Sequence, residues 1–208
     1  MASYQPAVFL DRDGVLIDLV ERADSYDSAK RPEEVRLAGG VAAGMRILAE
    51  LPFKLIVVSN QPGIAKATMT SDDLNAVTRE FLCQLLDAGA WVDAIYYCIH
   101  HPQAAAPHLR ATCPCRKPAP GMLTTAASDH RLSLAKSYMI GDHPKDITAG
   151  QAAGCTTIGI RGSYPFDPAN PPAIAFDSLF DAARWIASRE EPQRHVTAKP
   201  GSDRLGAA

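Results

Sequence analysis

Long hydrophobic runs are absent from the 208-residue sequence, and no stretch approaches the roughly 18 apolar residues of a membrane-spanning helix. The first ten residues, MASYQPAVFL, lack the charged region and long apolar region of a secretory signal. Excess positive charge is absent as well, because 21 Lys and Arg are balanced by 23 Asp and Glu. Aromatic residues are only 7% of the chain, and no basic, aromatic-rich stretch is present. We therefore expect neither a membrane nor a nucleic-acid partner.

Cysteine is scarce and odd in number. Three of the five cysteines lie within residues 98–115. This clustering is more typical of a metal site in a reducing compartment than of a disulfide framework, so we expect a cytoplasmic protein. The other two, Cys83 and Cys155, are expected to be buried apolar side chains without a function.

The composition predicts one globular domain, with 47% hydrophobic and 21% charged residues. A chain of this length can bury roughly 70% of the surface that its unfolded state exposes. We expect residues 1–188 to form a single domain. Residues 189–208 hold almost no apolar side chains and are expected to be a flexible C-terminal tail.

Short apolar runs alternate with helical patterns along the domain. The runs predict buried strands at residues 7–10, 55–58, 94–97, 138–140 and 156–160. Apolar residues at helical spacing, with capping and stop residues, predict helices around 45–48, 70–89, 144–154 and 178–188. The alternation favours an α/β fold, a Rossmann-like parallel sheet with helices on both faces. The polar segment 18–35 is expected to be a loop beside a ligand site.

Polar residues follow three of the predicted strands. Asp11, Ser59 and Asp142 each stand where an apolar run ends. Because the carboxyl ends of parallel strands share one edge of a sheet, and ligands bind there, these side chains are expected to converge. Asp13 would join them, and Asp146 is a further candidate. So many carboxylates repel one another unless a cation is present. Their oxygen atoms suit Mg²⁺.

Phosphoryl transfer is the chemistry that such a site supports. Lys117 and Ser59 can bind phosphate oxygens opposite the metal, where negative charge is spread in the transition state. A carboxylate nucleophile can form an aspartyl-phosphate, and a second carboxyl can protonate the leaving oxygen and then activate water. Two other interpretations use the same residues: a receiver-like phospho-accepting module, or turn residues in a zinc-organised binding scaffold. A receiver would lack an acid at position 13.

Four motifs in this order resemble those of the haloacid-dehalogenase phosphatase superfamily: Asp11-Arg12-Asp13-Gly14, Val57-Val58-Ser59-Asn60, Lys117-Pro118 and Gly141-Asp142-His143-Pro144-Lys145-Asp146. The segments FLDRDG, SNQPGIAK, IYYCIHHPQ, CPCRKPAPGML and SYMIGD are similar to the heptose-bisphosphate 7-phosphatase family, which shares much with the histidinol-phosphatases. The resemblance covers roughly residues 7 to 161. It implies a capless fold, which agrees with the 45 residues available between Asp13 and Ser59.

The resemblance also implies roles for the motif residues. Asp11 would be the nucleophile and Asp13 the general acid/base, while Ser59 and Lys117 would bind the transferring phosphate. Asp146 would orient Lys117 or a metal-bound water. Further roles follow by match: Mg²⁺ ligands Asp11, the backbone carbonyl of Asp13, and Asp142; substrate contacts Asn60, Gln61 and Arg116.

A second metal site is predicted in the segment 98–115. Three thiolates and an imidazole suit a closed, tetrahedral Zn²⁺ site, although the residues alone also allow two core cysteines and a surface histidine. His101 and His108 compete for the histidine position, and the resemblance favours His100. The implied zinc ligands are Cys98, His100, Cys113 and Cys115. Because the loop leads into Arg116 and Lys117, zinc would help to position the lysine.

The expected substrate is a small phosphorylated sugar, hydrolysed by a monomer in an open pocket. The family implies heptose 1,7-bisphosphate, cleaved at the 7-phosphate; histidinol phosphate is the alternative. A bisphosphate needs a second anion site, for which the candidates are Arg116, Arg22, Lys66 and Arg161. The residues after Gly14 depart from the family pattern, so the substrate contacts of segment 18–35 are not predicted.

Overall fold

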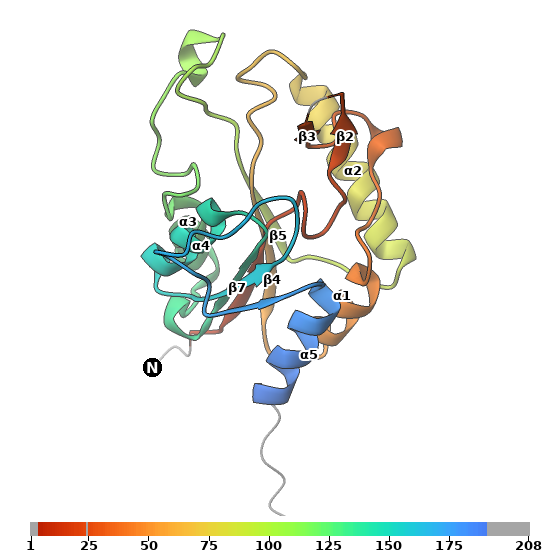
Figure 1. The fold of residues 1–208 in the computed structure, drawn as a ribbon, viewed down its shortest axis with the longest axis vertical. Helices are drawn as coiled ribbons and strands as arrows, with labels where there is room; N and C mark the ends of the chain where they lie inside the picture. The colour runs from red at the N-terminus through yellow and green to blue at the C-terminus, as the bar shows by residue number, and fades with distance from the viewer. Residues whose placement is uncertain (1–3, 24, 191–208) are drawn as a thin grey trace, which may run out of the picture.

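A parallel β-sheet forms the centre of the computed structural model, which describes residues 4–23 and 25–190 (Figure 1). Its strands lie in the order β5-β4-β1-β6-β7-β8, and all neighbours are parallel. This confirms the predicted α/β fold. The strand bounds are β1 Ala7–Leu10, β4 Lys54–Asn60, β5 Ala94–Cys98, β6 Tyr138–Gly141, β7 Thr156–Ile160 and β8 Ile174–Phe176.

Helices cover both faces of the sheet, as predicted. Alternate residues of β1 point in opposite directions: Val8 and Leu10 enter one core cluster, Ala7 and Phe9 the other. The first cluster includes residues of α1 (Val41–Ala49), α2 (Ser71–Asp87) and α5 (Leu179–Glu190). The second includes residues of α3 (Gly121–His130) and α4 (Pro144–Ala153). Every side chain of β1 is buried, which explains its continuous apolar run.

Local sequence signals set the ends of two helices. The Thr70 hydroxyl accepts a hydrogen bond from the Asp73 amide at 3.1 Å, and the Asp73 carboxylate accepts one from the Thr70 amide at 2.7 Å. This capping box starts α2. Pro144 occupies the first turn of α4, and Gly154 ends it in a left-handed conformation. These boundaries confirm the sequence prediction.

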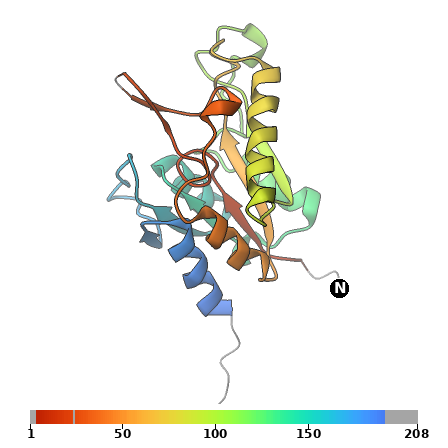
Figure 2. The same cartoon turned by 90° about the vertical axis from the view of Figure 1, so that its right-hand side faces the viewer.

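Several elements were not predicted. Helix α3 has no side-chain cap and only a weakly amphipathic pattern, and β8 is a three-residue edge strand after a proline-rich segment. The segment 18–35 is not a plain loop, because β2 (Val20–Arg22) and β3 (Ser25–Asp27) pair as an antiparallel hairpin. A 3₁₀ turn follows at Pro32–Glu34. In Figure 2 the hairpin projects away from the sheet. Its strands are too short to give a readable alternation.

Two further expectations need correction or comment. Cys155 is buried, but Cys83 is exposed, because position 83 falls outside the apolar stripe by which α2 contacts the core. Helix α5 continues to Glu190, past the expected boundary at residue 188. Most of the predicted tail, residues 191–208, lies outside the described residues. Within the described ranges, no helix combines the length and the hydropathy needed to cross a membrane.

Candidate active site

Three strand ends bring distant polar residues together. The central strand β1 pairs with β4 on one side and β6 on the other, so Asp11, Ser59 and Asp142 come to the same edge. The backbone amide of Asp11 donates to the carbonyl oxygen of Ile140 at 3.0 Å, which fixes Asp11 next to the end of β6. All three side chains are buried.

An acidic cluster forms at this edge. Carboxylate oxygens of Asp11, Asp142 and Asp146 lie within 4.8 Å of one another. Gly14 makes room for the cluster: its φ is +83°, and a Cβ atom there would lie 2.2 Å from Oδ2 of Asp142. The glycine of the DRDG motif therefore has a steric purpose beside its turn conformation.

Lys117 supplies the positive charge inside the cluster. Its Nζ lies 3.0 Å from Oδ1 of Asp11 and 2.7 Å from Oδ1 of Asp146, and donates to the carbonyl oxygen of Val58 at 2.7 Å. The Asn60 side chain holds the Lys117 backbone through two hydrogen bonds, of 3.0 and 2.9 Å. Burial opposes the lysine charge, but the charges of Asp11 and Asp146 outweigh it and raise the pKa of Lys117.

The surroundings shift the pKa values of the clustered carboxylates in different directions. Burial acts to raise the pKa of Asp11, but Lys117 and Lys145 outweigh it and lower that pKa. Burial, followed by the charges of Asp11 and Asp146, raises the pKa of Asp142 to about 7. Burial and Asp11 likewise raise the pKa of Asp146 to about 6. Negative charge is thus in excess, and this donor set of buried carboxylate oxygens fits Mg²⁺.

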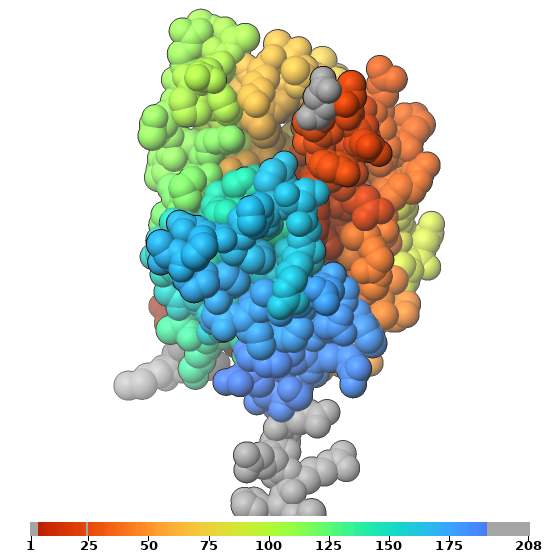
Figure 3. Space-filling model, viewed as in Figure 1, coloured from red at the N-terminus to blue at the C-terminus, as the bar shows by residue number. Residues whose placement is uncertain are grey.

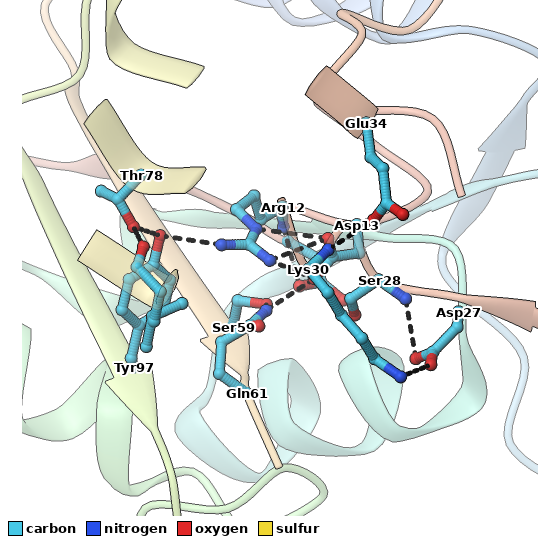
Figure 4. Close-up of polar contacts among 12 residues, drawn as sticks. Arg12, Asp13, Asp27, Ser28, Lys30, Glu34, Ser59, Gln61, Thr78 and Tyr97 are labelled. Atoms are coloured by element: carbon cyan, nitrogen blue, oxygen red, sulfur yellow. Dashed lines mark hydrogen bonds and ion pairs between the residues drawn. The ribbon is translucent and has the colours of Figure 1, made fainter. Parts of the chain in front are cut away.

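Asp13 lies outside that cluster of oxygen atoms and is held by two other side chains (Figure 4). Nη2 of Arg12 lies 3.0 Å from its Oδ1, and Nε2 of Gln61 donates to its Oδ2 at 2.6 Å. Gln61 also donates to the Ser59 hydroxyl at 3.1 Å. Gln61, expected to contact substrate, is almost fully buried and faces Asp13 and Ser59.

A pocket of ≈ 240 Å³ opens over the acidic cluster. Tyr26, Asp27 and Ser28 of the hairpin segment line one part of it, and Tyr164, after β7, lines another. In the space-filling view the red-orange hairpin region lies beside the blue segment that follows β7 (Figure 3). The remaining lining residues are Asp11, Asp13, Leu19, Ser59, Asn60, Pro62, Lys66, Arg116, Asp142 and Lys145.

The cations that line the pocket differ in part from those predicted for a second anion site. Lys66 and Arg116 line it, as does Lys145, which the sequence analysis did not single out. Arg22 instead forms an ion pair with Glu34 at 2.9 Å. Arg161 pairs with Asp177 at 2.9 Å, beside a different surface hollow. Neither arginine lines this pocket, because each is paired with a carboxylate outside it.

The four predicted zinc ligands also come together, at the end of β5. The Cys98, Cys113 and Cys115 sulfur atoms are 2.9 to 3.5 Å apart, and Nδ1 of His100 is 3.5 Å from Cys115 and 3.8 Å from Cys98. Ligands around one zinc ion would stand about 3.5 to 3.8 Å apart, given Zn–S and Zn–N distances of about 2.3 and 2.0 Å. Three of the five distances match this range, and Sγ of Cys115 lies closer than that to the other two sulfur atoms. With all four ligand atoms within 4.8 Å of one another, the cluster is consistent with a zinc site.

Comparison with known proteins gives a specific match. The chain is 36% identical to D-glycero-beta-D-manno-heptose-1,7-bisphosphate 7-phosphatase of Escherichia coli K12, over 92% of this chain and 99% of that protein. It is 38% identical to the Salmonella typhi enzyme of the same name, over 92% and 100%. The chain belongs to this phosphatase family. A family profile described as HAD-hydrolase-like also matches residues 114–182.

Solved structures agree with the assignment to the heptose-bisphosphate phosphatase family. A D,D-heptose 1,7-bisphosphate phosphatase from B. bronchiseptica, complexed with magnesium and phosphate, superposes with a TM-score of 0.72 at 26% identity, covering 88% of this chain and 99% of that one. A HAD-like phosphatase from Mesorhizobium loti gives a TM-score of 0.77 at 29% identity, over 93% and 91%. A magnesium ion in a member of the family accords with the acidic cluster described above.

Proposed function

We propose that this chain hydrolyses the 7-phosphate of D-glycero-D-manno-heptose 1,7-bisphosphate, as its relatives' names describe. The supporting observation is the ion pair of 3.0 Å between Asp11 and Lys117 at the end of β1, with Asp13 two residues further on. A receiver-like module would need the first two groups but not Asp13. Full-length similarity to the named phosphatases supports the substrate class.

In the first step, a carboxylate oxygen of Asp11 attacks phosphorus and the bond from phosphorus to the sugar oxygen breaks. Asp13 gives its proton to that leaving oxygen. Ser59 and Lys117 bind the oxygens of the transferring phosphoryl group. In the second step, a water molecule attacks phosphorus and gives its proton to Asp13. The bond between Asp11 and phosphorus breaks, which releases phosphate and restores both carboxyl groups.

The two metal sites have separate tasks in this proposal. Asp11, Asp142 and the backbone carbonyl of Asp13 would hold Mg²⁺, and Asp146 would keep Lys117 in position through its 2.7 Å ion pair. Bound magnesium would neutralise part of the charge that develops on the phosphoryl oxygens. Cys98, His100, Cys113 and Cys115 would hold structural Zn²⁺. The amide of Gly121 donates to the carbonyl oxygen of Pro114 at 2.9 Å, which attaches this loop to the start of α3.

The second phosphate of the substrate would meet Lys66, Arg116 and Lys145, the cations that line the pocket. Arg116 directly precedes Lys117, and its Nη1 donates to the carbonyl oxygen of His100 at 3.2 Å. The segment 98–115 with the predicted zinc ligands would therefore orient this arginine as well. The five thiols are unpaired, which supports the cytoplasmic location that we expect.

A phosphate-release screen tests the proposal. We would compare kcat/KM for both anomers of heptose 1,7-bisphosphate, fructose 1,6-bisphosphate and histidinol phosphate, and identify the sugar product by NMR. We expect one heptose bisphosphate to exceed the other compounds by at least about tenfold, with the 1-phosphate retained. A larger kcat/KM for histidinol phosphate, or removal of the 1-phosphate, would overturn the assignment.

A further inference from the structure

Arg12 is a fully buried cation whose charge the mechanism above does not use. Its side chain has no solvent exposure, although it lies between two residues that act on phosphate. Burial of a guanidinium is costly unless charged and hydrogen-bonding partners replace water. Nε of Arg12 donates to Oδ1 of Asp13 at 3.2 Å, and Nη2 donates to both carboxylate oxygens, at 3.0 and 3.2 Å. Asp13 is therefore held by the planar fork of Arg12.

The other side of the guanidinium is fixed by strand β5. Nη1 of Arg12 donates to the Tyr97 hydroxyl at 3.2 Å, and the guanidinium carbon lies 5.4 Å from the centre of the Tyr97 ring (Figure 4). The Tyr97 and Thr78 hydroxyl oxygens are 3.0 Å apart. Thr78 Oγ1 donates its single proton to the carbonyl oxygen of Leu74 at 2.7 Å. Tyr97 must therefore donate to Thr78.

The donors consequently run in one direction, from Arg12 to Tyr97, from Tyr97 to Thr78, and from Thr78 to the backbone of α2. We propose that this series of hydrogen bonds makes Arg12 a positioning residue. Arg12 then sets the orientation of the Asp13 carboxyl group toward the leaving oxygen and the attacking water. The proposal rests on the proposed function, because it needs Asp13 as the acid/base. Gln61 restrains the same carboxyl group from the side of Ser59.

The expected size of the effect follows from geometry. A well-placed general acid contributes about 10²- to 10⁴-fold to a rate, and a displacement of about 1 Å can cost about 100-fold. Arg12→Lys keeps the charge but removes the fork, so we expect kcat to fall by about 10- to 100-fold with little change in KM. Tyr97→Phe removes the hydroxyl that accepts from Arg12, and we expect about a threefold loss of kcat. Thr78→Val replaces the next hydroxyl by a methyl group, and we expect a loss no larger than that of Tyr97→Phe.

The leaving group separates positioning from general structural support. A sugar alkoxide needs a proton to leave, whereas p-nitrophenolate leaves without one. Rapid-quench measurement of phosphoenzyme formation should therefore show slower phosphorylation of Arg12→Lys and Tyr97→Phe by heptose bisphosphate. Phosphorylation by p-nitrophenyl phosphate should stay within about twofold of the unmodified protein. Tyr96→Phe is the matched control, because the Tyr96 hydroxyl donates to Asp129 at an exposed site, at 2.8 Å.

Each outcome decides between the proposals. Equal losses with both substrates, or no loss in either variant while Asp13→Asn is inactive, would overturn the positioning role and leave the proposed function intact. Full activity of Asp13→Asn on heptose bisphosphate would overturn the acid/base role of Asp13 and the positioning role with it, whereas an unmodified protein without activity on heptose bisphosphate would overturn the proposed function. If Arg12→Lys fails to fold, Tyr97→Phe and Thr78→Val decide the question, and the double variant should lose no more than the larger single loss.

Discussion

The two candidate metal sites are built in opposite ways. The acidic cluster brings Asp11 together with Asp142 and Asp146, which lie in one motif far along the chain, and encloses the charge of Lys117. The sulfur cluster uses one short segment, residues 98–115. In the first site, lysine charges lower the pKa of Asp11 despite its burial. Lysine side chains of the protein therefore neutralise part of the negative charge of the acidic cluster.

In the sulfur cluster the protein does less to stabilise the negative charge of the thiolates. Burial is the main cause that raises the pKa of Cys98 and of Cys115, and in Cys115 the hydrogen bonds to the other two thiols add to it. In Cys113 hydrogen bonds from the other two thiols outweigh burial, and its pKa is lowered. Only one of the three thiols is therefore favoured as a thiolate by the protein alone. We propose that the acidic cluster is organised without magnesium, whereas the segment 98–115 would depend on zinc for its organisation.

The largest expected effect comes from Asp11→Asn, which removes the nucleophile and leaves the organisation of the acidic site. Turnover should fall by at least about 10⁴-fold. The fold should persist, because a buried negative charge is removed and Lys117 keeps its ion pair with Asp146. Phosphate release and a thermal melt measure the two parts. Retained turnover would exclude the aspartyl-phosphate route, and an unfolded variant would contradict the preorganised acidic site.

Asp11 also illustrates what the sequence predicts well. Acidic residues that directly end apolar runs are local features, and the parallel topology makes them meet at one edge. The partners of those residues are less predictable. Tyr97 belongs to an apolar strand run, and its contact with Arg12 depends on the Tyr97 side chain lying on the face of the sheet that α2 covers. No spacing along the chain encodes that contact.

The prediction was weakest on which charged side chains reach the pocket. Arg22 and Arg161 were expected near a second phosphate, but each has a carboxylate partner elsewhere on the surface. Lys145 reaches the pocket because α4 starts directly after β6, and this follows from the position of the helix rather than from composition. The hairpin at residues 20–27 was missed for a related reason, since strands of three residues give no periodic pattern.

A smaller effect is expected when the sulfur site is removed. In Cys113→Ala/Cys115→Ala the segment 98–115, which leads into Arg116 and Lys117, would no longer hold zinc, so kcat should fall by roughly 10- to 100-fold and the loop should become sensitive to proteases. Activity, metal content and limited proteolysis measure this. Cys83→Ala, at an exposed cysteine of α2, is the control and should change nothing. If the zinc-free protein kept full turnover, the link between the two sites would be wrong.

The smallest effect is expected in the pH dependence of magnesium binding, because a proton competes with the metal for Asp142. Burial and neighbouring carboxylates give Asp142 a pKa of about 7, so the metal-free site takes up a proton as the pH falls through this value. Because magnesium needs the deprotonated form, its apparent Kd should rise about tenfold between pH 8 and pH 6. Calorimetric titration with Mg²⁺ at several pH values measures this, and Asp142→Asn should bind more weakly without that pH dependence. A constant Kd in the unmodified protein would mean that the lysines neutralise the whole cluster, and the excess of negative charge that we assign to it would be absent.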